Sequence, residues 1–357
     1  MDELPVIIQA RWGYPIGYSI SAEEIALHLD ALGLTVSHRP TPWPVPGDIR
    51  HPRLRELAAR PVPFDAIQLS YETANLFTVG HPGYRIGFTM LEVDGLPDDW
   101  VASCNAMDEV WVPSRWGAGV FAEMGVSRPL FTMPLGYDPA RFHPGLPARR
   151  HPDRYTFLSV FEWGARKGPD LLLRAYAAAF RRSDDVLLVL RVNNHDPDVD
   201  VAAEIARLGL DDDGPPVAVI LNTQLAPEAI GQLYCSADCF VLPTRGEGWG
   251  LPILEAMACG LPVIATDWSA QTEFLHAGVA VPLRVARLVP ADGKCPFYEG
   301  FRWAEPEFEH LVEALRTMAA QPAAGRALGT AAAAEVRQRW TWRQAAERMA
   351  ARLRQIG

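Results

Sequence analysis

A glycine-rich turn between two apolar segments, at residues 243–260, constrains the fold of this chain more than any other feature. The apolar run 239–242 that precedes it has the length and composition of a buried strand. Pro252 suits the first turn of a helix that would end at Gly260, and residues 262–266 are typical of a further strand. A strand, a glycine loop, a helix and a second strand form the repeating unit of an open parallel sheet.

Ligand chemistry is expected in the loop from Arg245 to Leu251, because ligands of such sheets bind beyond the carboxyl ends of the strands. The helix N-terminus after this loop favours negative charge, and its glycines would let backbone amides approach a ligand closely. Glu247 in the loop and Glu255 in the helix, with seven residues between them, would place two carboxylates on one rim. Each carboxylate could hold a set of hydroxyls, such as those of a hexose and of a ribose. The alternative is that both glutamates are only surface residues.

This stretch resembles the donor-site motif of retaining glycosyltransferases of the GT-B fold, in the large family 4, also called group 1. That family has two glutamates with seven residues between them, a Gly-aromatic-Gly segment inside that interval and a Glu-Ala-Met-Ala-Xaa-Gly-Xaa-Pro-Val tail, all of which occur at residues 247–263. The resemblance implies that Glu247 holds the hydroxyls of the donor sugar and that Glu255 holds the nucleotide ribose. The donor-binding residues expected beside them are Gly246, Gly248, Trp249, Gly250, Leu251, and Asn222 and Thr223 after a predicted strand at 217–221.

A second loop, at residues 162–168, follows a predicted strand and precedes a predicted helix that begins at Pro169. Two adjacent cations at a helix start, Arg166 and Lys167, would form a clamp on a diphosphate leaving group, although a solvated pair is the alternative. The loop resembles the family subset with Trp-Xaa-Xaa-Arg-Lys-Gly, and Glu162 stands where the usual pattern has an arginine. The resemblance implies that Lys167 and Arg166 stabilise the departing diphosphate and that the reaction needs no metal.

The N-terminal part repeats the strand and glycine-loop pattern, with a strand at 6–10 and a helix opened by a capping box of Ser21 and Glu24. The resemblance places the intervening loop near the donor phosphates and the acceptor. The loop residues concerned are Gly17, Tyr18 and Ser19. Family 4 members often carry a histidine where this chain has Leu91-Glu92. We expect Glu92 or His81 to take part of its role on the acceptor side, with an ordinary loop histidine as the alternative for His81.

The length of 357 residues suits two domains. The resemblance implies an α/β protein of the GT-B class, with two doubly wound Rossmann-like domains facing across a cleft. We expect an acceptor domain at residues 1–145 and a nucleotide-sugar donor domain at 154–335, joined by a linker with three prolines at 143–153. The remaining residues, 336–357, would form a helix that crosses back to the first domain.

Composition narrows the function further. The net charge of -10 argues against nucleic-acid binding, and a content of 49% hydrophobic and 21% charged residues is typical of a globular chain.

Five cysteines form no zinc-binding set, so reduced buried thiols in the cytoplasm are expected. Asp196-Pro197-Asp198 matches a metal-binding pattern but lies where it would cap a helix, so neither a metal nor a cofactor is predicted. The N-terminus does not resemble a signal peptide.

Several alternatives stay open. Basic residues at 41–63 and in the last helix would allow peripheral contact with the inner face of a membrane, but a solvated loop and a helix that crosses between domains are favoured. A sugar-nucleotide epimerase, a phosphorylase or a non-catalytic sugar-nucleotide-binding partner would share the same fold. For a transferase, the donor would be a UDP- or GDP-linked sugar, and the acceptor a glycan, a lipid-linked saccharide or a small molecule.

Overall fold

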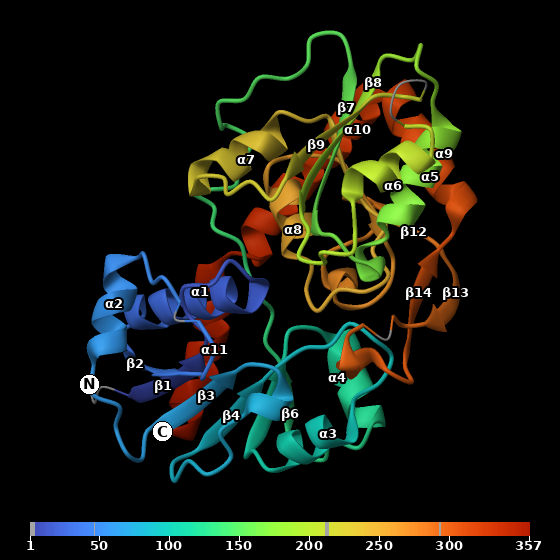
Figure 1. Cartoon of the computed structure of the whole chain (residues 1–357). Coiled ribbons are helices and arrows are strands. Elements are labelled where there is room, and N and C mark those ends of the chain that lie inside the picture. The colour runs from blue at the N-terminus through green and yellow to red at the C-terminus, as the bar shows by residue number, and fades with distance from the viewer. Residues whose placement is uncertain (1–3, 46, 211–213, 293) are drawn as a thin grey trace. The chain divides into compact units, whose positions relative to one another are not determined.

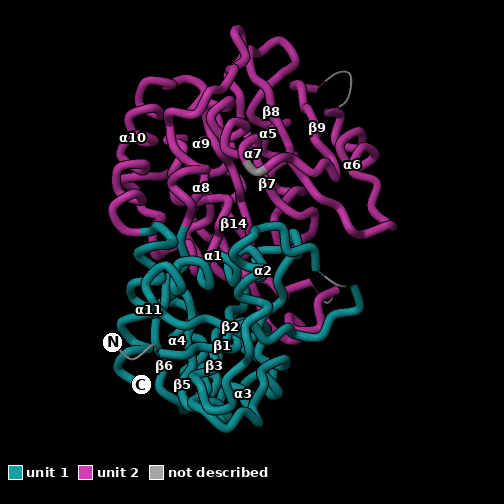
Figure 2. The backbone as a smooth tube through the Cα atoms, turned by 90° about the vertical axis from the view of Figure 1, so that its left-hand side faces the viewer, with its two compact units in different colours: residues 1–136, 340–357 teal, residues 137–339 magenta. Residues whose placement is uncertain are grey.

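The structure is a computed structural model that describes residues 4–45, 47–210, 214–292 and 294–357. The chain divides into two compact units, shown in two colours in Figure 2. Unit 1 comprises Met1–Gly136 and Trp340–Gly357, and unit 2 comprises Tyr137–Arg339. Each unit is a doubly wound α/β structure around its own six-stranded parallel sheet. The expected fold class, two Rossmann-like domains, is therefore confirmed.

Unit 1 has the strand order β2-β1-β3-β4-β5-β6. Its strands are β1 (Pro5–Ala10), β2 (Thr35–Pro40), β3 (Ile67–Tyr71), β4 (Arg85–Phe88), β5 (Glu109–Val112) and β6 (Leu130–Thr132). Its helices are α1 (Gly17–Ala31), α2 (Pro52–Ala59), α3 (Asp98–Asn105), α4 (Arg115–Glu123) and α11 (Trp342–Ile356), with a 3₁₀ turn η1 (Ala74–Leu76). The central strands are short apolar runs because helices cover both faces of the sheet, and Val6, Ile7 and Ile8 are fully buried.

Unit 2 has the strand order β12-β11-β10-β7-β8-β9. The strands are β7 (Tyr155–Glu162), β8 (Val186–Asn193), β9 (Val217–Leu221), β10 (Cys239–Leu242), β11 (Val263–Thr266) and β12 (Val281–Leu283). The helices are α5 (Pro169–Ala179), α6 (Val201–Arg207), α7 (Pro227–Cys235), α8 (Leu251–Ala258), α9 (Phe308–Ala320) and α10 (Pro322–Arg339). The 3₁₀ turns are η2 (Ala165–Lys167), η3 (Ala270–Glu273) and η4 (Pro296–Tyr298). An antiparallel hairpin, β13 (Val285–Pro290) and β14 (Arg302–Pro306), stands outside the six-stranded sheet (Figure 1).

The boundary between the units falls at residues 136 and 137, earlier in the chain than the proline-rich linker expected at 143–153. The reason is that the linker packs onto unit 2. Phe142 contacts Tyr234 edge to face, with ring centroids 5.9 Å apart. The Cys235 thiol donates a hydrogen bond to the carbonyl of His143 at 3.4 Å.

The predicted capping box at Ser21 is wrong, because α1 begins four residues earlier at Gly17. The last helix, expected at residues 336–357, begins later, at Trp342, because residues 336–339 still belong to α10. Thr341 caps α11 in a reciprocal capping box with Gln344. Thr341 has an extended backbone, which ends one helix and starts the next.

Helix α11 packs against α1 and completes unit 1, as Figure 2 shows. Its basic side chains have internal partners. Arg352 donates hydrogen bonds to the fully buried Glu109, the shortest being 2.6 Å, and Arg354 donates to the carbonyl of Leu32 at 2.9 Å. The basic character of the last helix thus has a structural explanation within unit 1. None of the helices in the described part of the chain combines the length and apolarity needed to cross a membrane.

Candidate functional site

The candidate site lies in unit 2 at the carboxyl ends of β7 and β10, which are neighbours at the centre of the sheet. From β7 the chain continues to β8 and β9 on one side, whereas from β10 it continues to β11 and β12 on the other. The loops after β7 and β10 therefore lie side by side at the point where the strand order reverses, and the amide of Arg245 donates a hydrogen bond to the carbonyl of Arg166 at 2.6 Å. In open α/β sheets this switch point is the usual place of ligand binding.

The loops after β7 and β10 bring three charged side chains together across 80 residues of sequence. The ammonium of Lys167 donates hydrogen bonds to both carboxylate oxygens of Glu247, at 2.6 and 2.8 Å. The guanidinium of Arg166 donates to the carbonyl of Gly246 at 2.8 Å and lies 3.5 Å from the Glu247 carboxylate. Glu247 is only 4% exposed. The predicted residues Glu247, Lys167 and Arg166 thus form one cluster.

Burial and charge act in opposite directions on Glu247. Removal of the carboxylate from water raises its pKa, but the adjacent Lys167 and Arg166 cations and the hydrogen bond from Lys167 outweigh this effect, so the pKa of Glu247 is lowered. The carboxylate is consequently ionised at neutral pH, and the cluster carries one negative and two positive charges. This leaves a net positive charge at the switch point, which suits an anionic ligand.

Two glycines allow the loops to approach one another. Gly168 has φ +69°, and a Cβ placed there would lie 2.3 Å from the carbonyl oxygen of Pro243 in the neighbouring loop. Gly250 has φ +95° and is the residue immediately before α8. Only glycine adopts such backbone angles without strain. These glycines therefore set how closely the Lys167 loop can approach the Glu247 loop.

A short turn after β11 fixes the backbone of Glu247. The hydroxyl of Ser269 accepts a hydrogen bond from the Glu247 amide at 2.8 Å and donates one to the side chain of Gln271 at 2.9 Å. The amide of Ala270 donates to the Glu247 carbonyl at 3.3 Å. Ser269 is fully buried and has φ +65° and ψ −153°, a region that strongly favours glycine. A strained non-glycine residue that holds a buried carboxylate in place is characteristic of functional sites.

Glu255 lies on α8, partly buried, and accepts a hydrogen bond from the hydroxyl of Tyr234 at 3.0 Å. Burial raises the pKa of Glu255 to about 7, against the opposing effects of the Tyr234 hydrogen bond and the charge of Arg141. Glu247 and Glu255 therefore have different electrostatic environments, although both come from one motif. Glu247 is paired with cations, whereas Glu255 has a neutral phenol as its hydrogen-bond donor.

Some of the predicted donor-binding residues have structural tasks. Trp249 is 2% exposed and packs against Phe274 with ring centroids 5.2 Å apart, so its ring belongs to the core of unit 2. Asn222, at φ 50°, accepts a hydrogen bond from the amide of Asn194 at 2.7 Å. The hydroxyl of Thr223 donates to the carbonyl of Leu221 at 3.1 Å. Both lie in the loop after β9, at the carboxyl edge of the sheet where they were predicted.

In unit 1, the residues expected in a glycine loop instead form the first turn of α1, which begins at Gly17. The hydroxyl of Tyr18 donates to the carbonyl of Met90 at 3.1 Å and accepts from the Met90 amide at 3.2 Å, so it joins α1 to the segment that leads to Glu92. Ser19 accepts a hydrogen bond from the amide of Tyr14 at 3.1 Å. Tyr18, Ser19 and Glu92 lie at the carboxyl edge of the unit 1 sheet.

His81 does not join this group. Its Nε2 atom is hydrogen-bonded to the carbonyl of Ala66 at 2.7 Å, just before the start of β3, and the residue is 6% exposed. His81 thus lies at the amino edge of the parallel sheet, opposite the edge where Glu92 follows β4. His81 lies at this edge because β3 and β4 are parallel, so the segment between them must return to the edge where both strands begin. The structure therefore places His81 and Glu92 at opposite edges of the unit 1 sheet.

Sequence reasoning missed several polar contacts at these edges. Arg11, after β1, donates hydrogen bonds to both carboxylate oxygens of the fully buried Glu72, after β3, with a shortest distance of 2.7 Å. The sequence did carry a signal for Arg11 and Glu72, because each is a charged residue directly after a strand. Tyr234 and Ser269 carried no such signal, because their partners, Glu255 and Glu247, lie 21 and 22 residues away.

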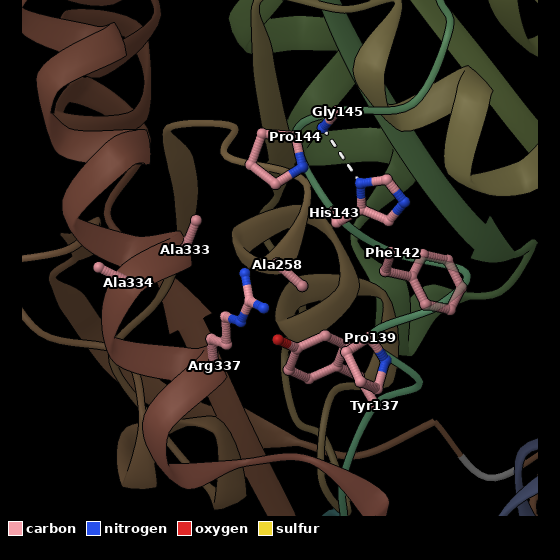
Figure 3. A pocket seen from close by; sticks show the side chains of 10 residues that line it. All are labelled: Tyr137, Pro139, Phe142, His143, Pro144, Gly145, Ala258, Ala333, Ala334 and Arg337. Carbon is pink, nitrogen blue, oxygen red and sulfur yellow. Dashed lines mark hydrogen bonds between the residues drawn. The ribbon is translucent and has the colours of Figure 1, made fainter.

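A separate cavity of about 490 Å³ lies in unit 2 between the segment that begins at Tyr137 and helix α10 (Figure 3). In Figure 3 the guanidinium of Arg337 points toward the hydroxyl of Tyr137, and Phe142, Pro144 and Ala258 supply apolar walls. None of the predicted site residues lines this cavity. Asp196, from the Asp-Xaa-Asp pattern, is paired with Lys294 at 2.6 Å, and Asp200 is the residue that caps α6.

Comparisons with known proteins identify related sequences and similar folds. Residues 152–294 match the family model of Glycosyl transferases group 1. A GDP-mannose-dependent alpha-(1-6)-phosphatidylinositol monomannoside mannosyltransferase of Mycolicibacterium smegmatis is 27% identical over 283 residues, which are 75% of this chain and 67% of the relative. Two further curated relatives match over only 32% and 33% of their own length.

Solved structures align over nearly the whole chain. Sucrose-phosphate synthase from Thermosynechococcus elongatus superposes with a TM-score of 0.72 and 18% identity, covering 99% of both chains. HepE of Anabaena, in complex with UDP and glucose, superposes with a TM-score of 0.75 and 16% identity, covering 99% of this chain and 100% of that protein. In fold, the chain is thus a GT-B protein, and its second unit carries the sequence pattern of the group 1 glycosyltransferases.

Proposed function

We propose that the protein is a retaining glycosyltransferase that moves a hexose from a nucleotide-diphosphate sugar to an acceptor hydroxyl. The observation that carries the proposal is the cluster of Lys167, Arg166 and Glu247 at the switch point of unit 2, in front of the N-terminus of α8. It combines cations for a diphosphate with a carboxylate for hydroxyls. The relative from Mycolicibacterium smegmatis is named for a GDP-mannose donor, and the HepE structure holds UDP and glucose, so either nucleotide fits the proposal.

The chemical task is to stabilise a departing diphosphate and a sugar that develops positive charge. Lys167 and Arg166 would neutralise the leaving group, and the amides at the start of α8 would add the positive end of its dipole. The ionised Glu247 would face the hydroxyls of the transferred sugar, and Glu255 would hold the ribose. These fixed charges supply the electrostatic stabilisation directly, and this supports a mechanism without a metal ion.

The Lys167–Glu247 ion pair has a consequence for donor binding. A diphosphate that approaches Lys167 competes with the Glu247 carboxylate for the three ammonium protons. As the ammonium turns toward the phosphates, the carboxylate is released to accept hydrogen bonds from the sugar. Because Arg166 also lies within reach of Glu247, the carboxylate keeps a cationic neighbour during this exchange. On donor binding, Lys167 would therefore exchange the Glu247 carboxylate for the phosphates, and Glu247 would exchange Lys167 for the sugar hydroxyls. Arg166 would keep the buried Glu247 carboxylate next to a cation throughout.

The division into units supports a division of labour. Unit 2 would hold the donor, whereas the carboxyl edge of unit 1, with Tyr18, Ser19 and Glu92, would help to bind the acceptor. A glycan, a lipid-linked saccharide and a small molecule remain the acceptor classes to test. Because sugar nucleotides are cytoplasmic metabolites, the proposal places the protein in the cytoplasm.

The experiment that tests the function is a thermal-shift screen over UDP- and GDP-linked sugars, followed by turnover of the best donor with acceptor panels and with water. We expect one donor to stabilise the protein, slow hydrolysis of that donor alone, transfer with retained anomeric configuration, and full activity in EDTA. Conversion of the donor to an epimer, or the absence of any stabilising nucleotide sugar, would contradict the proposal. Loss of activity in EDTA that magnesium or manganese restores would contradict the metal-independent mechanism alone.

A further inference from the structure

The hairpin of β13 and β14 is an addition to the doubly wound unit 2. Its two strands pair antiparallel with one another, whereas every pairing in the six-stranded sheet is parallel. It leaves the sheet after β12 and returns to α9, and Figure 1 shows it extending from the edge of the unit. The hairpin is a separate two-stranded sheet and shares no strand pairing with the six-stranded sheet of unit 2. Its contacts with other parts of the unit therefore indicate its role.

The hairpin is attached to the site loops at two places. Near its base, the guanidinium of Arg245 joins Glu305 of β14, at 2.7 Å, to Asp170 at the start of α5, at 2.9 and 3.0 Å. The amide of Ala304 also donates to the carbonyl of Arg245 at 3.0 Å. Toward its tip, Lys294 pairs with Asp196, in the loop after β8, at 2.6 Å. The hairpin is thus held directly against the loops that follow β10 and β8, and through Arg245 against the start of α5.

Between these two attachments lies a pocket of about 490 Å³, a size typical of small-molecule sites. The hairpin contributes Asp292, Lys294, Cys295, Tyr298 and Trp303 to its lining, and the loop after β7 contributes Trp163 together with Arg166 and Lys167. The pocket therefore adjoins the cations assigned to the donor diphosphate. Neither Glu247 nor Glu255 lines it, so it is distinct from the surfaces proposed for the donor sugar and the ribose.

The lining chemistry selects among ligand classes. Three aromatic side chains, those of Trp163, Tyr298 and Trp303, face the pocket with five carboxylates and three cations. The excess of carboxylates disfavours a second phosphate or nucleotide. Asp196 and Asp170 are already paired with Lys294 and Arg245, which disfavours a metal ion. Carboxylates that accept hydrogen bonds from hydroxyls, beside aromatic rings that contact an apolar ring face, are suited to a saccharide.

We propose that the hairpin pocket binds a saccharide ring of the acceptor and thereby brings the acceptor next to the proposed diphosphate site. This inference rests on the proposed transferase function, because it identifies the acceptor as a sugar-containing molecule. It also assigns part of acceptor recognition to the donor unit. Tyr298 and Glu162 are the residues to test, because Tyr298 is only half-buried, Glu162 is exposed, and neither belongs to the proposed catalytic cluster.

The test measures sugar binding directly by saturation-transfer difference NMR. The protein is first saturated with UDP or GDP, whichever binds by calorimetry, and then mixed with glucose, mannose, N-acetylglucosamine, maltose or cellobiose. We expect at least one sugar to bind while the nucleotide is present. Tyr298→Ala and Glu162→Gln should each weaken that binding about tenfold, in keeping with the loss of one good contact. The affinity for the nucleotide should not change.

Matched controls come from the same hairpin. Phe297→Ala and Glu299→Gln remove an aromatic ring and a carboxylate from positions next to Tyr298 that do not line the pocket, so they should bind sugar as the unaltered protein does. Circular dichroism and thermal unfolding check the fold of all four variants. No binding of any sugar, or equal binding by the pocket variants and their controls, would overturn the inference. Failure to bind any nucleotide would instead count against the proposed function, because sugar binding can be measured without it.

Discussion

The ammonium of Lys167 lies 2.6 and 2.8 Å from the two carboxylate oxygens of Glu247, a residue 80 positions further along the chain. The cation assigned to the leaving group and the carboxylate assigned to the sugar are therefore partners in this structure. Their charges compensate one another in a place where either would be costly to bury alone.

The first prediction concerns the stability of the pair. Lys167→Met leaves the buried Glu247 carboxylate with Arg166 as its remaining cationic neighbour, so the free energy of unfolding should fall by about 3 kcal/mol. The double variant Lys167→Met/Glu247→Gln should recover part of the loss, because no ionised group is then left without its partner. Urea denaturation measures both effects. Lys294→Met, which breaks an exposed ion pair of the same type, should change stability far less than Lys167→Met does. Additive losses in the double variant would show that the pair is not coupled.

The second prediction concerns the diphosphate. Lys167→Ala should weaken binding of the nucleoside diphosphate by on the order of a hundredfold and leave binding of the nucleoside almost unchanged, because the partner of Lys167 would be the diphosphate. Arg166→Ala should have the same selectivity if the two cations form a clamp. Isothermal titration calorimetry with UDP or GDP, and with uridine or guanosine, measures the difference. Equal losses for nucleoside and nucleotide would place these cations elsewhere.

The third prediction separates the two glutamates by kinetics. An interaction with the reacting sugar strengthens as charge develops, so Glu247→Gln should lower kcat by on the order of a hundredfold or more with little change in nucleotide affinity. An interaction with the ribose is similar in the ground and transition states, so Glu255→Gln should mainly raise KM for the donor. Steady-state kinetics and calorimetry distinguish the two patterns. Normal turnover by Glu247→Gln, or unchanged nucleotide affinity in Glu255→Gln, would refute the donor-site assignment.

The fourth prediction concerns pH and Glu255, whose pKa burial raises to about 7. Between the usual glutamate pKa and about 7, the folded protein holds a proton that the unfolded chain has released, so stability must fall as pH rises through this window. The stabilisation is fully present below pH 4.5 and is lost above about pH 7, with a total of at most about 3 kcal/mol. Urea denaturation from pH 4 to 8 should show a decline in the unaltered protein that Glu255→Gln lacks. Parallel curves for the two proteins would mean that Glu255 titrates normally.

The fifth prediction concerns Ser269, whose positive φ favours glycine and whose hydroxyl accepts a hydrogen bond from the Glu247 amide. Ser269→Ala loses the bond and keeps the strain, whereas Ser269→Gly loses the bond but relieves the strain. The glycine variant should therefore be the more stable of the two by about 1 kcal/mol. Both variants should have a reduced kcat, because neither holds Glu247 in place. Thermal unfolding and turnover measure these effects, and an alanine variant as stable as the glycine variant would show that the backbone is not strained.

Local pattern predicted several strands and loops of the two parallel sheets. The apolar runs at 6–10, 155–161 and 239–242, each followed by a glycine loop, predicted parallel strands that the structure confirms. The pattern also located Glu247, Glu255 and the adjacent cations at the carboxyl edge of one sheet. Periodicity, glycine and proline act over a few residues, so they can be read directly from a single sequence. The same local signals failed at Ser21, where a plausible capping box lies inside a helix that had already begun.

Long-range contacts were decided only by the tertiary structure. No local signal shows that Lys167 reaches Glu247, that Ser269 holds the Glu247 amide, or that the Trp249 ring packs in the core. Each depends on which strands are neighbours and on how closely their loops approach. The hairpin of β13 and β14 was missed for a related reason, because antiparallel pairing becomes visible only when the register of two strands is known. Sequence thus determines which elements form, whereas the order of strands in the sheet determines which side chains meet.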